Sequence, residues 1–201
     1  MTKTIQLIDY NSGLTDYSLA WNFQEELLQK ILQIKIRNQN ENLQIKTPNY
    51  LILCEHPHVY TLGKSGSRNN LLISDEKLKE LNVKYIENNR GGDITYHGPG
   101  QLGAYPILDL DHFFHDIHKY MRCLEEVVIR LLYSYGINAI RINDKTGVWI
   151  PSDLSDRAIK ICSMGVRTSR WITMHGLALN VNNDLTYFDY INPCGFNDIS
   201  I

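Results

Sequence analysis

Residues 90–101 read Arg90-Gly91-Gly92-Asp93-Ile94-Thr95-Tyr96-His97-Gly98-Pro99-Gly100-Gln101. This stretch holds four glycines and one proline within twelve residues. Glycine suits backbone that must adopt a positive φ or come close to a ligand. The stretch also carries an arginine, a histidine and a glutamine, which a plain turn does not need. Two interpretations stay open: a glycine-rich hairpin connection, and a loop whose backbone N–H groups approach a bound group.

Length and composition favour one globular domain over residues 1–201. The chain has 201 residues, of which 43% are hydrophobic and 21% are charged, and this length suits one substantial core. The net charge of −2 gives no reason to expect nucleic acid or an anionic membrane as a partner. No apolar run reaches the ~18–20 residues of a membrane span, and residues 1–6 lack the apolar core of a signal peptide. We therefore expect a cytoplasmic protein.

The chain offers no convincing metal or nucleotide motif. Four cysteines in 201 residues do not make a disulfide framework. Cys54, His56 and His58 are close enough in sequence to suggest a metal, but Pro57 interrupts them and no fourth ligand is evident. Gly63 and the two residues after it lack the earlier glycine of a phosphate-binding P-loop. The expectation is that no metal and no cofactor is bound.

Hydrophobic periodicity predicts two substantial helices. The first begins at Thr15 or Asp16 and ends before the polar run 38–42, and it should bury Leu19, Phe23, Leu27 and Ile31. The second covers residues 116–135 with Gly136 in the position of a C′ glycine. Its predicted buried face consists of Ile117, Met121, Leu124, Val128 and Leu131.

Short apolar or alternating runs predict many strands between and after these helices. They cover residues 5–10, 50–54, 59–62, 83–86, 104–110, 137–142, 147–150, 157–162 and 176–182. Helices mixed with many strands, without a repeat or a linker, predict an α+β fold built on a mixed β-sheet with flanking helices.

Cys194 is a candidate nucleophile because Pro193 and Gly195 place it in a turn, outside regular structure. The thiolate is the reactive form, and a free thiol with a pKa near 8.5 needs help to ionise at neutral pH. A cation about 4 Å away contributes roughly 4 kcal/mol at an effective dielectric near 20, equivalent to about three pKa units. An ordinary loop cysteine remains the alternative.

Lys160 is the candidate cation, since it interrupts an alternating apolar strand between Ile159 and Ile161. Desolvation in such a place would also let it pass protons. The alternative is a lysine that protects an edge strand against aggregation. Cys162 shares the strand face of Lys160, so the pattern leaves it open as a rival thiol. His175 and the glycines Gly165 and Gly176 add further polar or small groups nearby.

The chain resembles the lipoate–protein ligase B family, the octanoyl-[acyl-carrier-protein]:protein N-octanoyltransferases. The resemblance runs in order through roughly residues 50–195 and rests on these stretches: 55–57, 61–63, 90–101, 124–128, 160–163, 175–180 and 192–195. It implies one octanoyltransferase catalytic domain over 1–201 with a fold similar to the catalytic domains of biotin and lipoate protein ligases.

The resemblance also implies the site. Cys194 would carry the acyl thioester and Lys160 would complete a Cys–Lys dyad. The implied acyl-pocket contacts are Arg90, Gly91, Gly92, Asp93, Ile94, Thr95, Tyr96, His97, Ser163, Met164, Gly165, Gly176, Leu177 and Ala178.

The implied reaction is the first step of endogenous protein lipoylation, without ATP, metal or cofactor. Octanoyl-acyl-carrier protein would be the donor. The acceptors would be lysines of lipoyl domains in 2-oxoacid dehydrogenase complexes and of the glycine cleavage H protein. Because acyl-carrier proteins are acidic, a docking rim of Lys64, Arg68, Arg167 and Arg170 is expected.

Two other functions remain open. An ATP-dependent lipoate or biotin ligase on the same fold would form an acyl-adenylate and would not need Cys194. A catalytically silent acyl-carrier-binding module would hold the donor without forming a covalent adduct. ATP dependence and covalent acylation distinguish the three.

Overall fold

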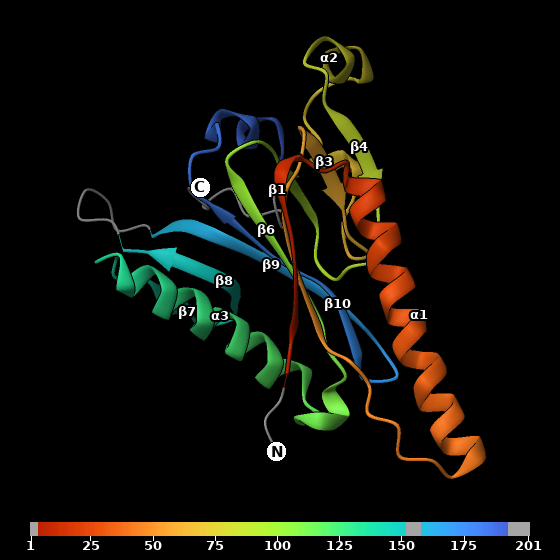
Figure 1. The fold of residues 1–201 in the computed structure, drawn as a ribbon. Helices are drawn as coiled ribbons and strands as arrows, with labels where there is room; N and C mark the ends of the chain where they lie inside the picture. The colour runs from red at the N-terminus through yellow and green to blue at the C-terminus, as the bar shows by residue number, and fades with distance from the viewer. Residues whose placement is uncertain (1–3, 152–157, 193–201) are drawn as a thin grey trace.

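The computed structural model describes residues 4–151 and 158–192, and places two β-sheets side by side (Figure 1). A seven-stranded sheet has the order β1-β2-β6-β10-β9-β8-β7, and a three-stranded sheet has the order β4-β3-β5. The strands are β1 Gln6–Leu14, β2 Tyr50–Glu55, β3 Val59–Leu62, β4 Lys84–Glu87, β5 Ile94–His97, β6 Gln101–Ile107, β7 Ile140–Ile142, β8 Lys145–Ile150, β9 Ile159–Ser169 and β10 Ile172–Asn180. The helices are α1 Tyr17–Glu41, α2 Asp75–Glu80 and α3 Ile117–Ser134, with 3₁₀ turns η1 Arg68–Asn70, η2 Leu110–His112 and η3 Leu185–Tyr190.

The large sheet is mixed, as predicted. β1 and β2 pair in parallel, and α1 lies between them in the chain. The other neighbours in this sheet pair antiparallel. Alternate residues of β2 show how the two faces are used, since Ile52 packs with α1 and Leu51 packs in the cluster with α3. The two long helices therefore cover opposite faces of the sheet (Figure 1).

The helix α1 begins where predicted and ends later than predicted. The Asp16 side chain accepts from the Ser18 and Leu19 N–H groups and caps the helix. The helix then continues through the polar run to Glu41, and Asn42 ends it in the left-handed conformation. The predicted buried face is confirmed at Leu27 and Ile31 and is wrong at Leu19, which is 66% exposed. Ala20 and Gln24 are buried in the first half of the helix instead.

The helix α3 matches its prediction more closely. Leu124 and Val128 are buried, and Gly136 has φ +77 just beyond the helix end. Leu131 was predicted to be buried but is 41% exposed, and Leu132 takes its place. Among residues 4–151 and 158–192, no helix combines the length and apolar composition needed to cross a membrane.

Two strand predictions were wrong where the functional stretches lie. Residues 94–97, predicted as part of a loop, form β5 and pair antiparallel with β3. The strand predicted to end at residue 162 continues to Ser169, since β9 pairs with β10 along its length. The polar and small residues in these stretches hid the strands from a hydrophobic-period argument.

A buried glutamate fixes α3 to the far edge of the large sheet. The Glu125 side chain has no exposed surface, and its carboxylate accepts from the Gly147 N–H at 3.0 Å. It also pairs with Arg141 at 3.2 Å and with Arg122 at 3.0 Å. A buried carboxylate with this many partners ties α3 to β7 and β8.

We expect Glu125→Ala to lower the free energy of unfolding by about 1–3 kcal/mol, because it leaves the buried Gly147 N–H without its acceptor. Arg122 and Arg141 are 44% and 33% exposed and can turn to water. The matched control is Glu126→Ala, whose side chain is 39% exposed and pairs with Arg130 and Arg141; it should cost less than about 1 kcal/mol. Urea unfolding measures both values. Equal losses in the two variants would contradict this role for Glu125.

Candidate active site

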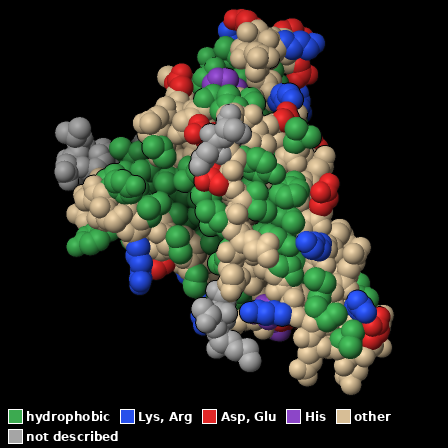
Figure 2. All heavy atoms as spheres, in the orientation of Figure 1, with side chains coloured by type: hydrophobic (Ala, Val, Ile, Leu, Met, Phe, Trp, Pro, Cys, Tyr) green, Lys and Arg blue, Asp and Glu red, His purple; other side chains and the backbone are tan. Residues whose placement is uncertain are grey.

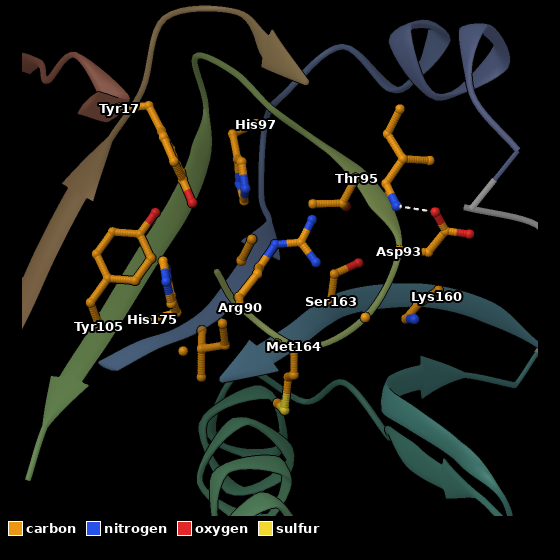
Figure 3. Close-up of a pocket in the computed structure, with 16 residues that line it drawn as sticks. Tyr17, Arg90, Asp93, Thr95, His97, Tyr105, Lys160, Ser163, Met164 and His175 are labelled. Carbon is orange, nitrogen blue, oxygen red and sulfur yellow. Dashed lines mark hydrogen bonds between the residues drawn. The ribbon is translucent and has the colours of Figure 1, made fainter. Parts of the chain in front are cut away.

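One pocket is lined by all three of the stretches implied by the resemblance (Figure 3). From those stretches the lining residues are Arg90, Gly92, Asp93, Ile94, Thr95, His97, Ser163, Met164, Gly165, Gly176, Leu177 and Ala178, together with Lys160. Gly91 and Tyr96 are not among the lining residues. Figure 3 shows Lys160 and Asp93 at one end of the pocket and Tyr17, Tyr105 and His175 at the other.

Arg90 holds the glycine-rich loop against the small sheet. Its side chain is buried and crosses to β3, where Nη2 donates to the Thr61 carbonyl oxygen at 2.6 Å and contacts Thr61 Oγ1 at 3.0 Å. The Gly91 N–H donates to the Val166 carbonyl oxygen at 2.9 Å, so the loop also attaches to β9. The loop therefore joins the two sheets at the pocket, and the Gly91 N–H serves the protein instead of a bound group.

A second loop closes over the first. The N–H groups of Gly63, Lys64 and Ser65 donate to the carbonyl oxygens of Asp93, Arg90 and Gly92. Three backbone donors on consecutive residues give the glycine-rich loop a fixed shape before any ligand arrives.

Two glycines let the strands come close to their neighbours at the pocket floor. Gly165 of β9 and Gly176 of β10 are directly paired. A Cβ on Gly165 would lie 2.7 Å from the Gly91 carbonyl oxygen, and a Cβ on Gly176 would lie 2.2 Å from that of Ala104. No side chain fits at either position without moving backbone, so glycine is required at both.

Lys160 is not an edge-strand lysine. β9 lies between β8 and β10, and the edges of the large sheet are β1 and β7. Lys160 pairs with Trp149 of β8, and its ammonium lies 5.0 Å from the centroid of the Trp149 ring. The aromatic face attracts the cation and orients it at one end of the pocket.

Cys162 is a poor nucleophile in this structure. It has no exposed surface and packs in the apolar cluster with Val128 and Val148, on the α3 side of the sheet. Burial raises the pKa of the Cys162 thiol to about 12, against the opposing charge of Lys160. Its thiolate is therefore scarce at neutral pH. The other candidate thiol, Cys194, lies outside the described residues.

Four pocket-lining or adjacent groups were not predicted as site residues: Tyr17, Tyr105, His56 and His175. Tyr17 stacks on His97 with ring centroids 5.5 Å apart. The Tyr105 hydroxyl donates to His56 Nε2 at 2.6 Å, and burial raises the Tyr105 pKa well above its usual range. Tyr17 begins α1 and Tyr105 lies mid-strand, so no local sequence signal marks them.

His175 is a buried neutral imidazole on the pocket wall. Its Nε2 donates to Asn89 Oδ1 at 2.7 Å, since the Asn89 amide donates in turn to Glu25. Burial, with the nearby charge of Arg90, lowers the His175 pKa to about 3. Its φ of +58 is unusual for a non-glycine residue and turns the side chain out of the strand's normal alternation.

The suspected metal ligands have other roles. His56 Nδ1 donates to the Thr15 carbonyl oxygen at 2.6 Å and its Nε2 accepts from Tyr105, so both nitrogens are used. His58 stacks on Tyr187 and hydrogen-bonds Tyr96 instead. In the described part of the chain, no group of three or more potential ligands gathers.

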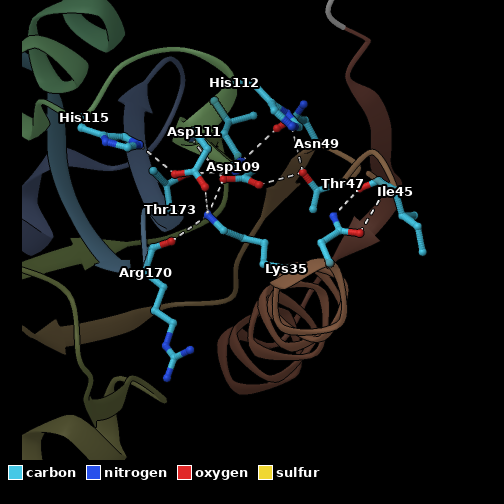
Figure 4. A network of polar contacts seen from close by, with 12 residues as sticks. Lys35, Ile45, Thr47, Asn49, Asp109, Asp111, His112, His115, Arg170 and Thr173 are labelled. Atoms are coloured by element: carbon cyan, nitrogen blue, oxygen red, sulfur yellow. Dashed lines mark hydrogen bonds and ion pairs between the residues drawn. The ribbon is translucent and has the colours of Figure 1, made fainter. Parts of the chain in front are cut away.

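The four basic residues expected as a docking rim do not gather at the pocket. Arg68 pairs with Asp75, and Arg167 pairs with Glu25 at 2.7 Å. Arg170 contributes its carbonyl oxygen to a network around Lys35, in the turn after β9 (Figure 4). Figure 2 shows lysines and arginines scattered over this face of the molecule. Two rim candidates adjoin the site: Lys64, in the loop that closes over the glycine-rich stretch, and Arg167, whose partner Glu25 also binds Asn89 beside His175.

We expect iodoacetamide at pH 8 to label the exposed Cys123 of the folded protein and to leave Cys54 and Cys162 unmodified. Burial raises the pKa of each buried thiol to about 12, so only about one in 10⁴ is a thiolate at that pH. Peptide mass mapping locates the label, and urea-unfolded protein, in which every cysteine should react, is the control. Labelling of Cys162 as fast as Cys123 would restore it as a candidate nucleophile.

Comparisons with known proteins identify relatives over almost the whole chain. The family model of the lipoyl protein ligase A/B catalytic domain matches residues 16–199. An octanoyltransferase of Flavobacterium psychrophilum is 56% identical over 195 residues, which are 97% of this chain and 83% of that protein. One of Christiangramia forsetii is 57% identical over 195 residues, 97% of this chain and 82% of its own length.

A solved structure shares the fold. It is a putative lipoate protein ligase from T. acidophilum, with a TM-score of 0.63 and 19% identity, covering 100% of this chain and 79% of the other. The matched family model and the curated relatives together show that this chain belongs to the lipoyl protein ligase A/B catalytic domain family.

Proposed function

We propose that this chain transfers an octanoyl group from octanoyl-acyl-carrier protein to a lysine of a lipoyl domain, through a thioester on Cys194. Curated relatives at 56–57% identity are named octanoyltransferases and support an acyltransferase activity. The observation that carries the proposal is the pocket itself, which brings Lys160 together with backbone-rich walls from three distant stretches.

The position of Asn192 supports Cys194 as the nucleophile. The Asn192 N–H donates to the Asn70 carbonyl oxygen at 2.7 Å. The Asn70 side chain donates to Asp93, which lines the pocket beside Lys160. Two residues of chain reach at most about 7 Å between Cα atoms, so covalent geometry keeps Cys194 within that distance of Asn192.

Lys160 supplies the charge that a working thiol needs. An ammonium about 4 Å from a thiolate contributes roughly 4 kcal/mol at an effective dielectric near 20, about three pKa units before desolvation. The Trp149 ring lies 5.0 Å from the ammonium and attracts it. In this arrangement Lys160 both ionises Cys194 and acts as the proton carrier of the reaction.

The Met164 N–H is a suitable donor for the developing oxyanion. In an antiparallel strand the N–H and C=O of one residue point to the same side, and residues two apart share that side. The Val166 carbonyl accepts from Gly91, away from β10, so Met164 presents its N–H to that side also. β8 pairs with β9 only as far as Cys162, which leaves this side of Met164 to the pocket.

The proposed reaction has two balanced steps. In the first, the Cys194 thiolate attacks the donor thioester, the donor C–S bond breaks, and the departing thiolate takes a proton from Lys160. In the second, the neutral acceptor amine attacks the octanoyl thioester, and the Cys194 C–S bond breaks. The proton that the amine loses returns to Lys160, so the dyad ends as it began. A thioester is already activated, and neither step calls for ATP or a metal.

The proposed acceptors are lysines of lipoyl domains in 2-oxoacid dehydrogenase complexes and of the glycine cleavage H protein. The alternative within the same fold is an ATP-dependent ligase. One structural neighbour is a lipoate-protein ligase A bound with ATP, at 18% identity and a TM-score of 0.63, and this likeness extends to the fold alone. A silent acyl-carrier-binding module is the second alternative.

The deciding experiment is intact-protein mass spectrometry after mixing with octanoyl-acyl-carrier protein in the absence of ATP. We expect one added octanoyl group on the wild-type chain and none on Cys194→Ser. The matched control Cys162→Ser should keep the adduct and most of the transfer to a lipoyl domain, because that buried thiol takes no part in the chemistry.

Each other outcome selects a different function. An adduct lost only in Cys162→Ser would transfer the nucleophilic role to Cys162. Acceptor modification that requires ATP and survives Cys194→Ser would identify a ligase. Donor binding without an adduct or acceptor modification would identify the silent module.

A further inference from the structure

Asn70 connects two parts of the site that are far apart in the sequence. It lies in the 3₁₀ turn η1, outside the pocket lining, and is half-buried. We propose that Asn70 is a positioning residue that fixes the segment leading to Cys194 against the pocket wall. This inference rests on the proposed function, because it concerns the approach of that thiol to the acyl group.

The first connection is made by backbone. The Leu72 N–H donates to the Tyr190 carbonyl oxygen at 2.9 Å, and the Asn192 N–H donates to the Asn70 carbonyl oxygen at 2.7 Å. Leu71 and Ile191 form an antiparallel bridge between these bonds. The segment 70–72 therefore binds residues 190–192 as a short ladder that ends two residues before Cys194.

The second connection is made by the side chain. Asn70 Nδ2 donates to Asp93 Oδ2 at 2.5 Å. A carboxylate only accepts, so the amide is oriented with its nitrogen toward Asp93. The other oxygen of Asp93 accepts from the Ile94 N–H at 2.7 Å, which holds the carboxylate against the start of β5.

The packing around Asp93 leaves it little freedom to move. A Cβ on Gly66 would lie 2.4 Å from Asp93 Oδ1, so the closing loop lies directly against the carboxylate. The Gly63 N–H donates to the Asp93 carbonyl oxygen. Asp93 is thus a fixed point on the pocket wall, and Asn70 transmits that position to Asn192.

Loss of the Asn70–Asp93 hydrogen bond should lower the rate of Cys194 octanoylation more than it lowers the stability of the fold. A displacement of about 1 Å in a reacting group can cost roughly 10²-fold in rate. Asn70 does not line the pocket, so it should act through Cys194 and leave donor binding unchanged. The donor and acceptor of the Asn70–Asp93 hydrogen bond can be exchanged by substituting both residues. Such an exchange should restore function only if the hydrogen bond itself matters.

The test is a charge-swap series on the full chain. In Asn70→Asp, two carboxylates face each other, and we expect the single-turnover rate of Cys194 octanoylation at saturating donor to fall about 10- to 100-fold. In the double variant Asn70→Asp with Asp93→Asn, the amide and carboxylate exchange places, and most of the lost rate should return. Asn69→Asp, which adds the same charge at the exposed neighbour, is the matched control and should keep the wild-type rate.

A second measurement does not depend on activity. Hydrogen exchange of the Asn192 amide should speed up in Asn70→Asp and slow again in the double variant, because that N–H donates to Asn70. A double variant as slow in octanoylation as Asn70→Asp, or a loss confined to donor affinity, would overturn the proposal. If wild-type protein forms no adduct on Cys194, the proposed function fails. If hydrogen exchange of the Asn192 amide is unchanged in Asn70→Asp, the Asn70 side chain does not position residues 190–192, whatever the function.

Discussion

The hydrogen bond from the Gly91 N–H to the Val166 carbonyl is the contact on which the site depends. It attaches the glycine-rich loop to β9, while Arg90 attaches the same loop to β3 through Thr61. The two sheets have no shared strand, and this junction holds the glycine-rich wall of the pocket against the β9 wall. Glycine at 165 is a steric condition for the junction, since a Cβ there would lie 2.7 Å from the Gly91 carbonyl oxygen. Glycine at 176 is required for a different contact, with Ala104 of β6.

Two side chains of β9 near this junction, Lys160 and Cys162, lie in very different surroundings. Lys160 reaches the pocket from an interior strand and rests on an aromatic ring. Cys162, two residues along the same strand, is sealed in apolar packing against α3 and has a raised pKa. The strand thus places Lys160 in the pocket lining and Cys162 in the apolar packing, which is the division that the proposed reaction requires. Asn70 hydrogen-bonds both Asp93 of the pocket wall and the backbone of Asn192, so it connects the wall to the segment before Cys194.

The sequence was sufficient for the mixed sheet and the Gly136 helix end, and it placed the first helix cap at Thr15 or Asp16, of which Asp16 is the cap. It missed β5 and the second half of β9, where polar and small residues replace the apolar period. It placed Lys160 and Cys162 on one face of the strand, which was wrong. β8 and β9 shift register between Val148 and Trp149, so Cys162 pairs with Val148 in the cluster against α3 and Lys160 pairs with Trp149. This shift depends on the partner strand and has no local sequence signal. Tyr17, Tyr105 and the left-handed His175 reach the pocket for reasons that no short window contains.

The central claim is that Lys160 and Cys194 meet beside this pocket, and a crystal structure of the trapped octanoyl thioester tests it most directly. We expect Cys194 Sγ within about 4 Å of Lys160 Nζ, the separation at which the ammonium supplies the required stabilisation. The acyl chain should lie over the paired strand segments 163–165 and 176–178, which line the pocket together. An acyl group found elsewhere, or an ammonium turned away from the sulfur, would contradict the account.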